Sequence, residues 1–126
     1  MPRDPLPDDL QRFVLTSVPS VPFVEAMLVY GAAGGEPVAV ETVASRLYIS
    51  PRAAQEIVEQ LVGAGVIAPA GNGHRFAPAS PELAGRLQQL TQFYRTNLVD
   101  VTDLIHSRSR RAAHQFADAF KLRKDS

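Results

Sequence analysis

Hydrophobic residues recur at intervals of three or four positions over most of this chain, which is the spacing of a helix with one buried face. Stretches of this kind cover residues 10–14, 23–33, 43–47, 54–62 and 83–105. Proline and glycine residues stand between the stretches and set the borders of the predicted helices. The pattern therefore predicts a mainly helical protein.

The middle of the chain carries the most informative succession of elements. Residues 37–40 form a short strand candidate, and residues 41–48 carry the first helical pattern. Ser50 is a good N-cap and Pro51 suits the first helical position, so a second helix is expected to begin there. Gly63-Ala64-Gly65 ends it. Two consecutive helices joined by a tight turn are therefore predicted.

A β-hairpin is expected directly after these helices. Residues 66–77 form two apolar arms around a Gly71-Asn72-Gly73 tip, and glycine and asparagine tolerate the positive φ angles of a tight hairpin turn. Pro69 lacks a backbone N–H, so the first arm must be an edge strand at that position.

Helices are also expected on both sides of this region. On the N-terminal side, Asp8 or Asp9 caps a short helix and Ser20 caps the next one. On the C-terminal side, Ser80 and Pro81 open a long helix whose apolar stripe continues to Ile105. Residues 112–120 mark a last amphipathic helix.

In this order of elements, residues 38–78 resemble the winged helix-turn-helix of bacterial transcriptional regulators of the MarR, ArsR and Rrf2 type. The matching segments are Val43-Ala44-Ser45-Arg46-Leu47, Ile49-Ser50-Pro51, Ile57-Val58-Glu59-Gln60-Leu61 and Ala64-Gly65-Val66-Ile67. The resemblance implies a mainly α fold with a small β-wing, extended by a long C-terminal helical region. It also implies transcription regulation through binding of double-stranded DNA, with no cofactor.

The resemblance makes the helix from Pro51 to Val62 a recognition helix, whose first residues meet base edges in the major groove. Arg52 then suits guanine and Gln55 suits adenine, because each side chain can make two hydrogen bonds to that base. Other residues hold phosphate from the helices or from the wing. The expected DNA-binding residues are Ser45, Arg46, Ser50, Arg52, Gln55, Glu56, His74 and Arg75.

The charges of this region favour a second hypothesis. Glu56 and Glu59 would face a phosphate-rich groove, and residues 38–78 contain only three arginines. A monomer with so few cations binds DNA weakly. DNA binding then needs a dimer or help from the basic segment 106–126, which has six Lys and Arg against two Asp. Otherwise the module is a degenerate winged helix that docks on a protein partner such as a regulator, a sigma factor or polymerase.

The long C-terminal helix offers a way to form a homodimer. Its apolar stripe either pairs with a second chain, with Asn97 setting the register, or packs on the body of its own chain. The dimerisation residues expected under the first alternative are Leu87, Leu90, Tyr94, Asn97, Leu98 and Val101. Tyr30, Tyr48 and Tyr94 are each interpreted most simply as packing residues.

Composition predicts where the domains begin and end, and it argues against several classes of function. Residues 1–9, rich in proline and aspartate, are expected to be disordered, 10–78 to form the winged helix domain and 79–126 the helical extension. No signal peptide, transmembrane run or cysteine is present, so a cytoplasmic protein with no membrane contact is expected. No nucleophile motif or metal-ligand spacing occurs, so neither an enzyme nor a metal site is expected.

Overall fold

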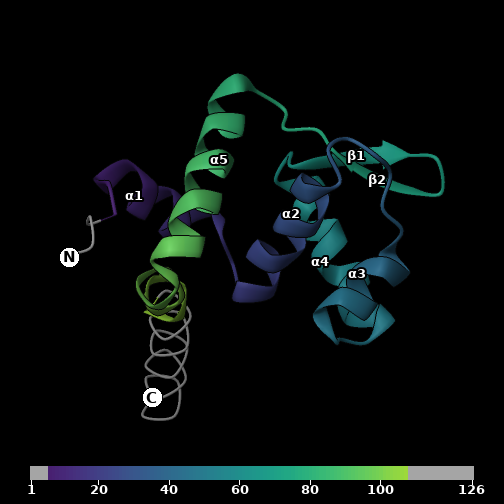
Figure 1. The fold of residues 1–126 in the computed structure, drawn as a ribbon, viewed down its shortest axis with the longest axis horizontal. Coiled ribbons are helices and arrows are strands. Elements are labelled where there is room, and N and C mark those ends of the chain that lie inside the picture. Colours follow the sequence, from purple (N-terminus) through teal and green to yellow (C-terminus); the bar gives the residue numbers. More distant parts are fainter. Residues whose placement is uncertain (1–5, 108–126) are drawn as a thin grey trace, which may run out of the picture.

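The computed structural model describes residues 6–107, in which helices predominate and one small antiparallel sheet is present (Figure 1). The mainly helical fold with a small β-hairpin is therefore confirmed. Residues 98–107 are helical as well. The elements, in chain order, are α1 (Asp8–Ser17), α2 (Val21–Ala32), α3 (Val40–Leu47), α4 (Pro51–Gly63), β1 (Ile67–Ala70), β2 (Gly73–Phe76) and α5 (Pro81–Thr96). The basic segment from residue 108 and the helix expected at 112–120 lie outside the described residues.

Helix α2 lies at the centre of the fold. It contacts α3, α4 and β2, whereas α1 and α5 pack against each other (Figure 1). Its buried side chains include Phe23, Met27 and Tyr30. Burial of a large apolar side chain contributes about 1.5–3 kcal/mol, so this helix is a principal source of stability. Its central place also leaves α3, α4 and the hairpin together on one side of the molecule.

Three helices begin in a similar way, with a serine N-cap and a proline at the first or second helical position. Ser20, Ser50 and Ser80 each accept a hydrogen bond from the backbone N–H three residues later, at 3.3, 3.1 and 3.1 Å. These caps confirm the predicted starts of α2, α4 and α5. Such a cap contributes about 1 kcal/mol relative to alanine.

Residues 6–9 differ from the disorder expected for residues 1–9, whereas residues 1–5 lie outside the described residues. Leu6 is buried, and the side-chain amide of Gln11 donates a hydrogen bond to its carbonyl oxygen at 2.8 Å. Helix α1 begins at Asp8 after Pro7, with no side-chain cap, so the predicted aspartate cap is wrong. Asp8 and Asp9 instead occupy the first turn, where a negative charge favours the helix dipole. Burial of Leu6 therefore fixes the position of residues 6–9, which composition alone predicts to be disordered.

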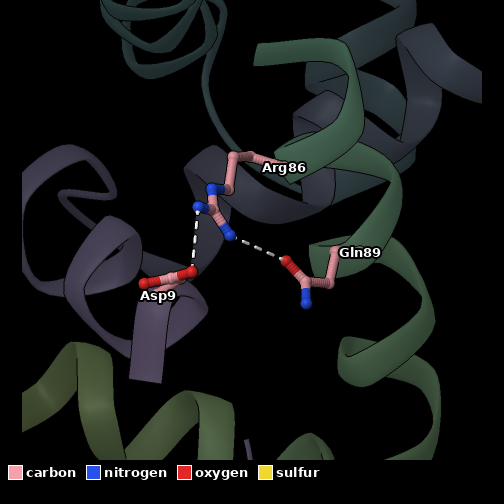
Figure 2. Close-up of polar contacts among 3 residues, drawn as sticks. All are labelled: Asp9, Arg86 and Gln89. Atoms are coloured by element: carbon pink, nitrogen blue, oxygen red, sulfur yellow. Dashed lines mark hydrogen bonds and ion pairs between the residues drawn. The ribbon is translucent and has the colours of Figure 1, made fainter. Parts of the chain in front are cut away.

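An ion pair joins α1 to α5. The Nη2 atom of Arg86 lies 3.5 Å from Oδ2 of Asp9, and its Nη1 atom donates to Oε1 of Gln89 at 3.3 Å (Figure 2). Asp9 is exposed and the Arg86 side chain is half-buried, and ion pairs near the surface contribute at most about 1 kcal/mol. The pair thus positions α1 more than it stabilises the fold.

Residues 37–40 do not form the expected strand, and one residue of the four pairs with the hairpin. Val38 forms an isolated antiparallel bridge with His74, donating at 2.7 Å and accepting at 3.1 Å, and Val40 already begins α3. A side chain at Gly73 would collide with the Val38 carbonyl group, so only glycine fits this crossing. The bridge fastens the chain before α3 to the outer side of β2.

The hairpin forms where it was predicted. Ile67 pairs with Phe76 and Ala70 with Gly73, which leaves Gly71 and Asn72 as a two-residue turn. Gly71 has a φ of 56°, as a type II′ turn requires at its first position. Among residues 6–107, β1 pairs with no strand other than β2, so Pro69 lies on an edge strand, as its missing N–H requires.

The long C-terminal helix is broken at Asn97, contrary to the uninterrupted helix that the apolar stripe predicted. Asn97 has a φ of −127° and a ψ of 47°, and helical structure resumes at residue 98. The Thr96 hydroxyl donates to the Asn97 side-chain oxygen at 2.8 Å, and Val101 N–H donates to the Asn97 carbonyl at 3.0 Å. Short polar side chains of this kind compete with the helical hydrogen bonds.

The apolar stripe of the C-terminal region packs within its own chain. Five of the six residues expected in a dimer seam are buried within the chain: Leu87, Leu90, Tyr94, Asn97 and Val101. Leu98 alone of the six is exposed, at 50% of its surface. The predicted seam is therefore wrong for these five residues. The stripe packs on the body of its own chain, since α1 packs against α5 and the Tyr94 hydroxyl of α5 donates to Glu25 of α2.

Candidate nucleic-acid interface

The turn between α3 and α4 fixes how the two helices meet. Tyr48 ends α3 with a left-handed backbone, at a φ of 56° and a ψ of 44°. Tyr48 N–H donates to the Ser45 carbonyl at 3.4 Å, and Ile49 N–H donates to the Ala44 carbonyl at 3.0 Å. These two bonds make a Schellman motif, in which the left-handed position is usually glycine.

Helix α4 has one buried face and one exposed face. Ala54, Ile57, Val58 and Leu61 are buried against the rest of the fold. The opposite side carries the exposed polar residues Arg52, Gln55, Glu56, Glu59 and Gln60. Since residues three and four apart share a helix face, this row is a continuous surface. The two predicted base-contacting residues, Arg52 and Gln55, therefore lie on the outer side of α4.

The predicted adenine contact of Gln55 meets a competitor on the same helix. Its side-chain amide donates to the Glu59 carboxylate, one helical turn later, at 3.4 Å. Recognition of adenine uses the amide nitrogen and the amide oxygen of Gln55 together. The Glu59 carboxylate thus binds the amide nitrogen of Gln55, which is one of the two groups that adenine recognition needs.

The three expected phosphate ligands near the turn are all exposed. Ser45 and Arg46 lie at the C-terminal end of α3, and Ser50 caps α4. The Ser50 oxygen accepts from Ala53 N–H, which leaves its hydroxyl proton available to a phosphate oxygen. The two ends of the turn therefore present one cation and two hydroxyl groups to solvent.

The hairpin does not bring His74 and Arg75 together. They are successive residues of β2, so their side chains point to opposite faces. Arg75 is exposed, whereas His74 is half-buried and its backbone is bonded to Val38. Arg75 is the better placed of the two to meet a phosphate group.

Charge on this part of the surface is balanced. Residues 38–78 contain three arginines (Arg46, Arg52 and Arg75) and three glutamates (Glu41, Glu56 and Glu59). All six side chains are exposed. Each phosphate neutralised by a cation contributes about 0.9 to the salt dependence of DNA binding, so one chain has a small electrostatic affinity.

The three tyrosines divide in a way that the sequence did not indicate. Tyr30 and Tyr94 are buried, as expected, but Tyr48 is 95% exposed, so its interpretation as a packing residue is wrong. Its place just before Ile49-Ser50-Pro51, at a helix end where glycine is usual, was the available signal.

The buried tyrosines differ in their hydrogen bonds. The Tyr94 hydroxyl donates to the Glu25 carboxylate at 3.3 Å, whereas within the described residues the Tyr30 hydroxyl has no partner. Burial raises the pKa of Tyr30. Burial, followed by the Glu25 charge and hydrogen bond, raises the pKa of Tyr94.

Two other features bear on function. A hollow of about 400 Å³ lies between α2 and α5 and is lined mainly by apolar groups, with Gln88, Thr91 and Arg95 as its polar residues. Within residues 6–107, no group of three His, Asp or Glu side chains is arranged to hold a metal ion. Within the same range, no single helix has the length and apolarity to cross a membrane, although α1 and α2, bent by 106°, meet that test as a pair.

Comparisons with known proteins leave the site without a family assignment. No protein-family model matches the sequence, and no curated protein matches it. Among solved structures, the chain is similar to RV1404 from Mycobacterium tuberculosis, at 21% sequence identity and a TM-score of 0.48. The match covers 90% of this chain and 83% of that chain. A similarity of this size carries no argument about function, which depends on the geometry described above.

Proposed function

We propose that this protein is a cytoplasmic, DNA-binding transcriptional regulator that uses residues 38–78 as a winged helix-turn-helix. The observation that carries the proposal is the outward face of α4, which presents Arg52 and Gln55 beside an exposed turn and next to a hairpin. In such a module the second helix enters the major groove. Arg52 then pairs with a guanine, while Ser50, Arg46 and Arg75 bind phosphates on either side.

The small number of cations makes a homodimer part of the proposal. One chain supplies three arginines on this surface, and two chains joined on a palindromic site supply twice as many. The α5 stripe is used internally, so the interface must lie elsewhere. Leu98 and Val99 are neighbouring apolar residues, 50% and 55% exposed, and are available to a second copy. The mass of the chain in solution, with and without DNA, tests this part.

Binding to genomic DNA fragments at about 50 mM salt tests the function, because low salt favours every phosphate contact. Wild-type protein is expected to retard a subset of fragments. Arg52→Ala is expected to relax the preference at one base pair by about 1–3 kcal/mol. Arg12→Ala is the matched control, since it removes an equal charge from an exposed position on α1. If the wild-type protein retards no fragment even at low salt, the proposal is overturned.

A second function is favoured by Glu56 and Glu59, which lie exposed on the same face of α4 as Arg52. A basic protein partner of the transcription machinery would bind such a face better than DNA does. Replacement of both glutamates by Gln separates the two functions. The double variant binds DNA more tightly if α4 enters a groove, and it loses a stoichiometric, nuclease-resistant protein complex if α4 docks on a partner.

A further inference from the structure

We propose that Tyr48 is a DNA-contacting residue, which binds the sugar–phosphate backbone beside the groove that α4 enters. This inference rests on the proposed function and adds a ligand to the same site. Tyr48 is the residue that ends α3, two positions before the Ser50 cap of α4. Its hydroxyl donates to a phosphate oxygen, and its ring lies against the adjoining sugar.

The backbone at Tyr48 is the first observation. Tyr48 is the one residue other than glycine with a positive φ within residues 6–107. The left-handed conformation costs a residue with a Cβ atom about 1–2 kcal/mol, and glycine avoids that cost. The fold needs only the Schellman hydrogen bonds at this point, and backbone atoms make both of them. A tyrosine here is therefore not required by the turn.

The exposure of the side chain is the second observation. Tyr48 is 95% exposed, more than any other large hydrophobic residue described. Within the described part of the chain its hydroxyl donates to no group. Neither packing nor a hydrogen bond offsets the unfavourable backbone. Left-handed residues other than glycine cluster at sites that contact other molecules.

The surroundings of Tyr48 decide the kind of molecule. Arg46, Ser50 and Arg52 lie within four residues of it, and all three are exposed. Tyr48 lies between Arg46 and Ser50 in the turn that joins α3 to α4, so a duplex with phosphates on both of these residues passes beside Tyr48. Tyrosine hydroxyls are among the neutral groups that bind phosphate. A neutral donor suits this surface, because its three arginines are balanced by three glutamates.

Two substitutions test the assignment with the full-length protein and duplex DNA. Tyr48→Gly removes the side chain and relieves the backbone, so we expect an unchanged or higher melting temperature together with about tenfold weaker binding. Tyr48→Phe keeps the ring and loses the hydroxyl, so we expect a smaller loss of affinity. A residue with a merely structural role would instead lower the melting temperature when it is replaced.

The pattern across DNA sequences and salt concentrations separates Tyr48 from its neighbours. A contact to the DNA backbone lowers the affinity for specific and non-specific duplexes by the same factor, unlike Arg52→Ala. Because tyrosine is neutral, the salt dependence is expected to stay as in the wild type, whereas Arg46→Ala reduces its slope by about 1.

Each of the other outcomes contradicts the Tyr48 assignment, the proposed function, or both. If the wild-type protein binds duplex DNA and Tyr48→Gly binds it equally well, the Tyr48 assignment fails and the proposed function stands. If only one DNA sequence is affected, Tyr48 contacts a base rather than the backbone. If the wild-type protein binds no DNA, both proposals fail. If Tyr48→Gly retains DNA binding but loses a protein complex, the turn belongs to a protein-docking surface.

Discussion

Tyr30 contributes a buried hydroxyl group without a hydrogen-bond partner to the part of the core that the structure describes. Its side chain is completely buried in α2, and within the described residues its hydroxyl has no hydrogen-bond partner. An unsatisfied buried hydroxyl costs about 1–3 kcal/mol, because it gives up its hydrogen bonds to water. A phenylalanine at this position keeps the ring and its packing.

We therefore expect Tyr30→Phe to raise the free energy of unfolding by about 1 kcal/mol, measured by urea denaturation. Tyr94→Phe is the matched control, because it removes a hydroxyl that donates to Glu25 at 3.3 Å. That control should lower the free energy of unfolding by about 0.5–1.5 kcal/mol. A loss of stability in Tyr30→Phe would show that its hydroxyl binds an internal water molecule.

The hydrogen bond between Gln55 and Glu59 leads to a prediction about affinity. Glu59→Ala removes a negative charge from the outer face of α4 and frees the Gln55 amide, which now donates to it at 3.4 Å. We expect DNA affinity to rise about three- to tenfold, as measured by fluorescence anisotropy. Glu82→Ala, which removes an equal charge from an exposed position on α5, should have little effect. Equal gains from both variants would indicate a general charge effect rather than a freed side chain.

At the scale of elements, the glycines of the hairpin and of α5 have opposite requirements. A Cβ atom at Gly73 would collide with the Val38 carbonyl group, whereas a Cβ atom at Gly85 meets nothing within 4 Å. Gly73→Ala is expected to lower the free energy of unfolding by about 1–3 kcal/mol and to separate Val38 from β2. Gly85→Ala should raise it by up to about 1 kcal/mol, because alanine favours the helix. Thermal or urea unfolding of Gly73→Ala and Gly85→Ala measures both effects. A similar loss of stability in the two variants would contradict the close approach of Gly73 to the Val38 carbonyl group.

The elements that could be predicted from the sequence are those set by local chemistry. Ser20, Ser50 and Ser80 mark helix starts because a serine cap and a following proline act within one turn of the chain. The Gly71-Asn72 turn is equally local. The strand at 37–40 could not be placed as well, because its single pairing to His74 joins residues 36 positions apart.

Packing partners were harder to predict than helix borders. The stripe on α5 has the same spacing whether a second chain or the chain's own α1 and α2 covers it, and the structure supplies the latter. The exposed positions of Arg52 and Gln55 followed from the helical period of α4. The exposure of Tyr48 did not, because its left-handed backbone lies outside any periodic pattern.

At the scale of the whole molecule, the two buried tyrosines limit stability at alkaline pH. Burial raises the pKa of both Tyr30 and Tyr94 above the ordinary value of 10.0. The unfolded chain therefore loses these protons at a lower pH than the folded chain does. The contribution of the two protonated tyrosines to the free energy of unfolding is fully present below about pH 10. It is lost as the pH rises through the higher pKa values of the folded state.

We expect the urea midpoint of the wild-type protein to fall above about pH 10. The double variant Tyr30→Phe/Tyr94→Phe should lose much of this dependence, since phenylalanine does not titrate. Unfolding curves at several pH values between about 8 and 11 make the comparison. An equally steep fall in the double variant would assign the alkaline transition to other groups.

The bridge between Val38 and His74 has a mechanical consequence. It fastens the chain that enters α3 to the middle of the hairpin, so neither can tilt without the other. A load applied at the Gly71-Asn72 tip would reach the first turn of α3 through two backbone bonds rather than through soft side chains. A partner that binds the Gly71-Asn72 turn would therefore also fix the orientation of α3 and α4 relative to that partner.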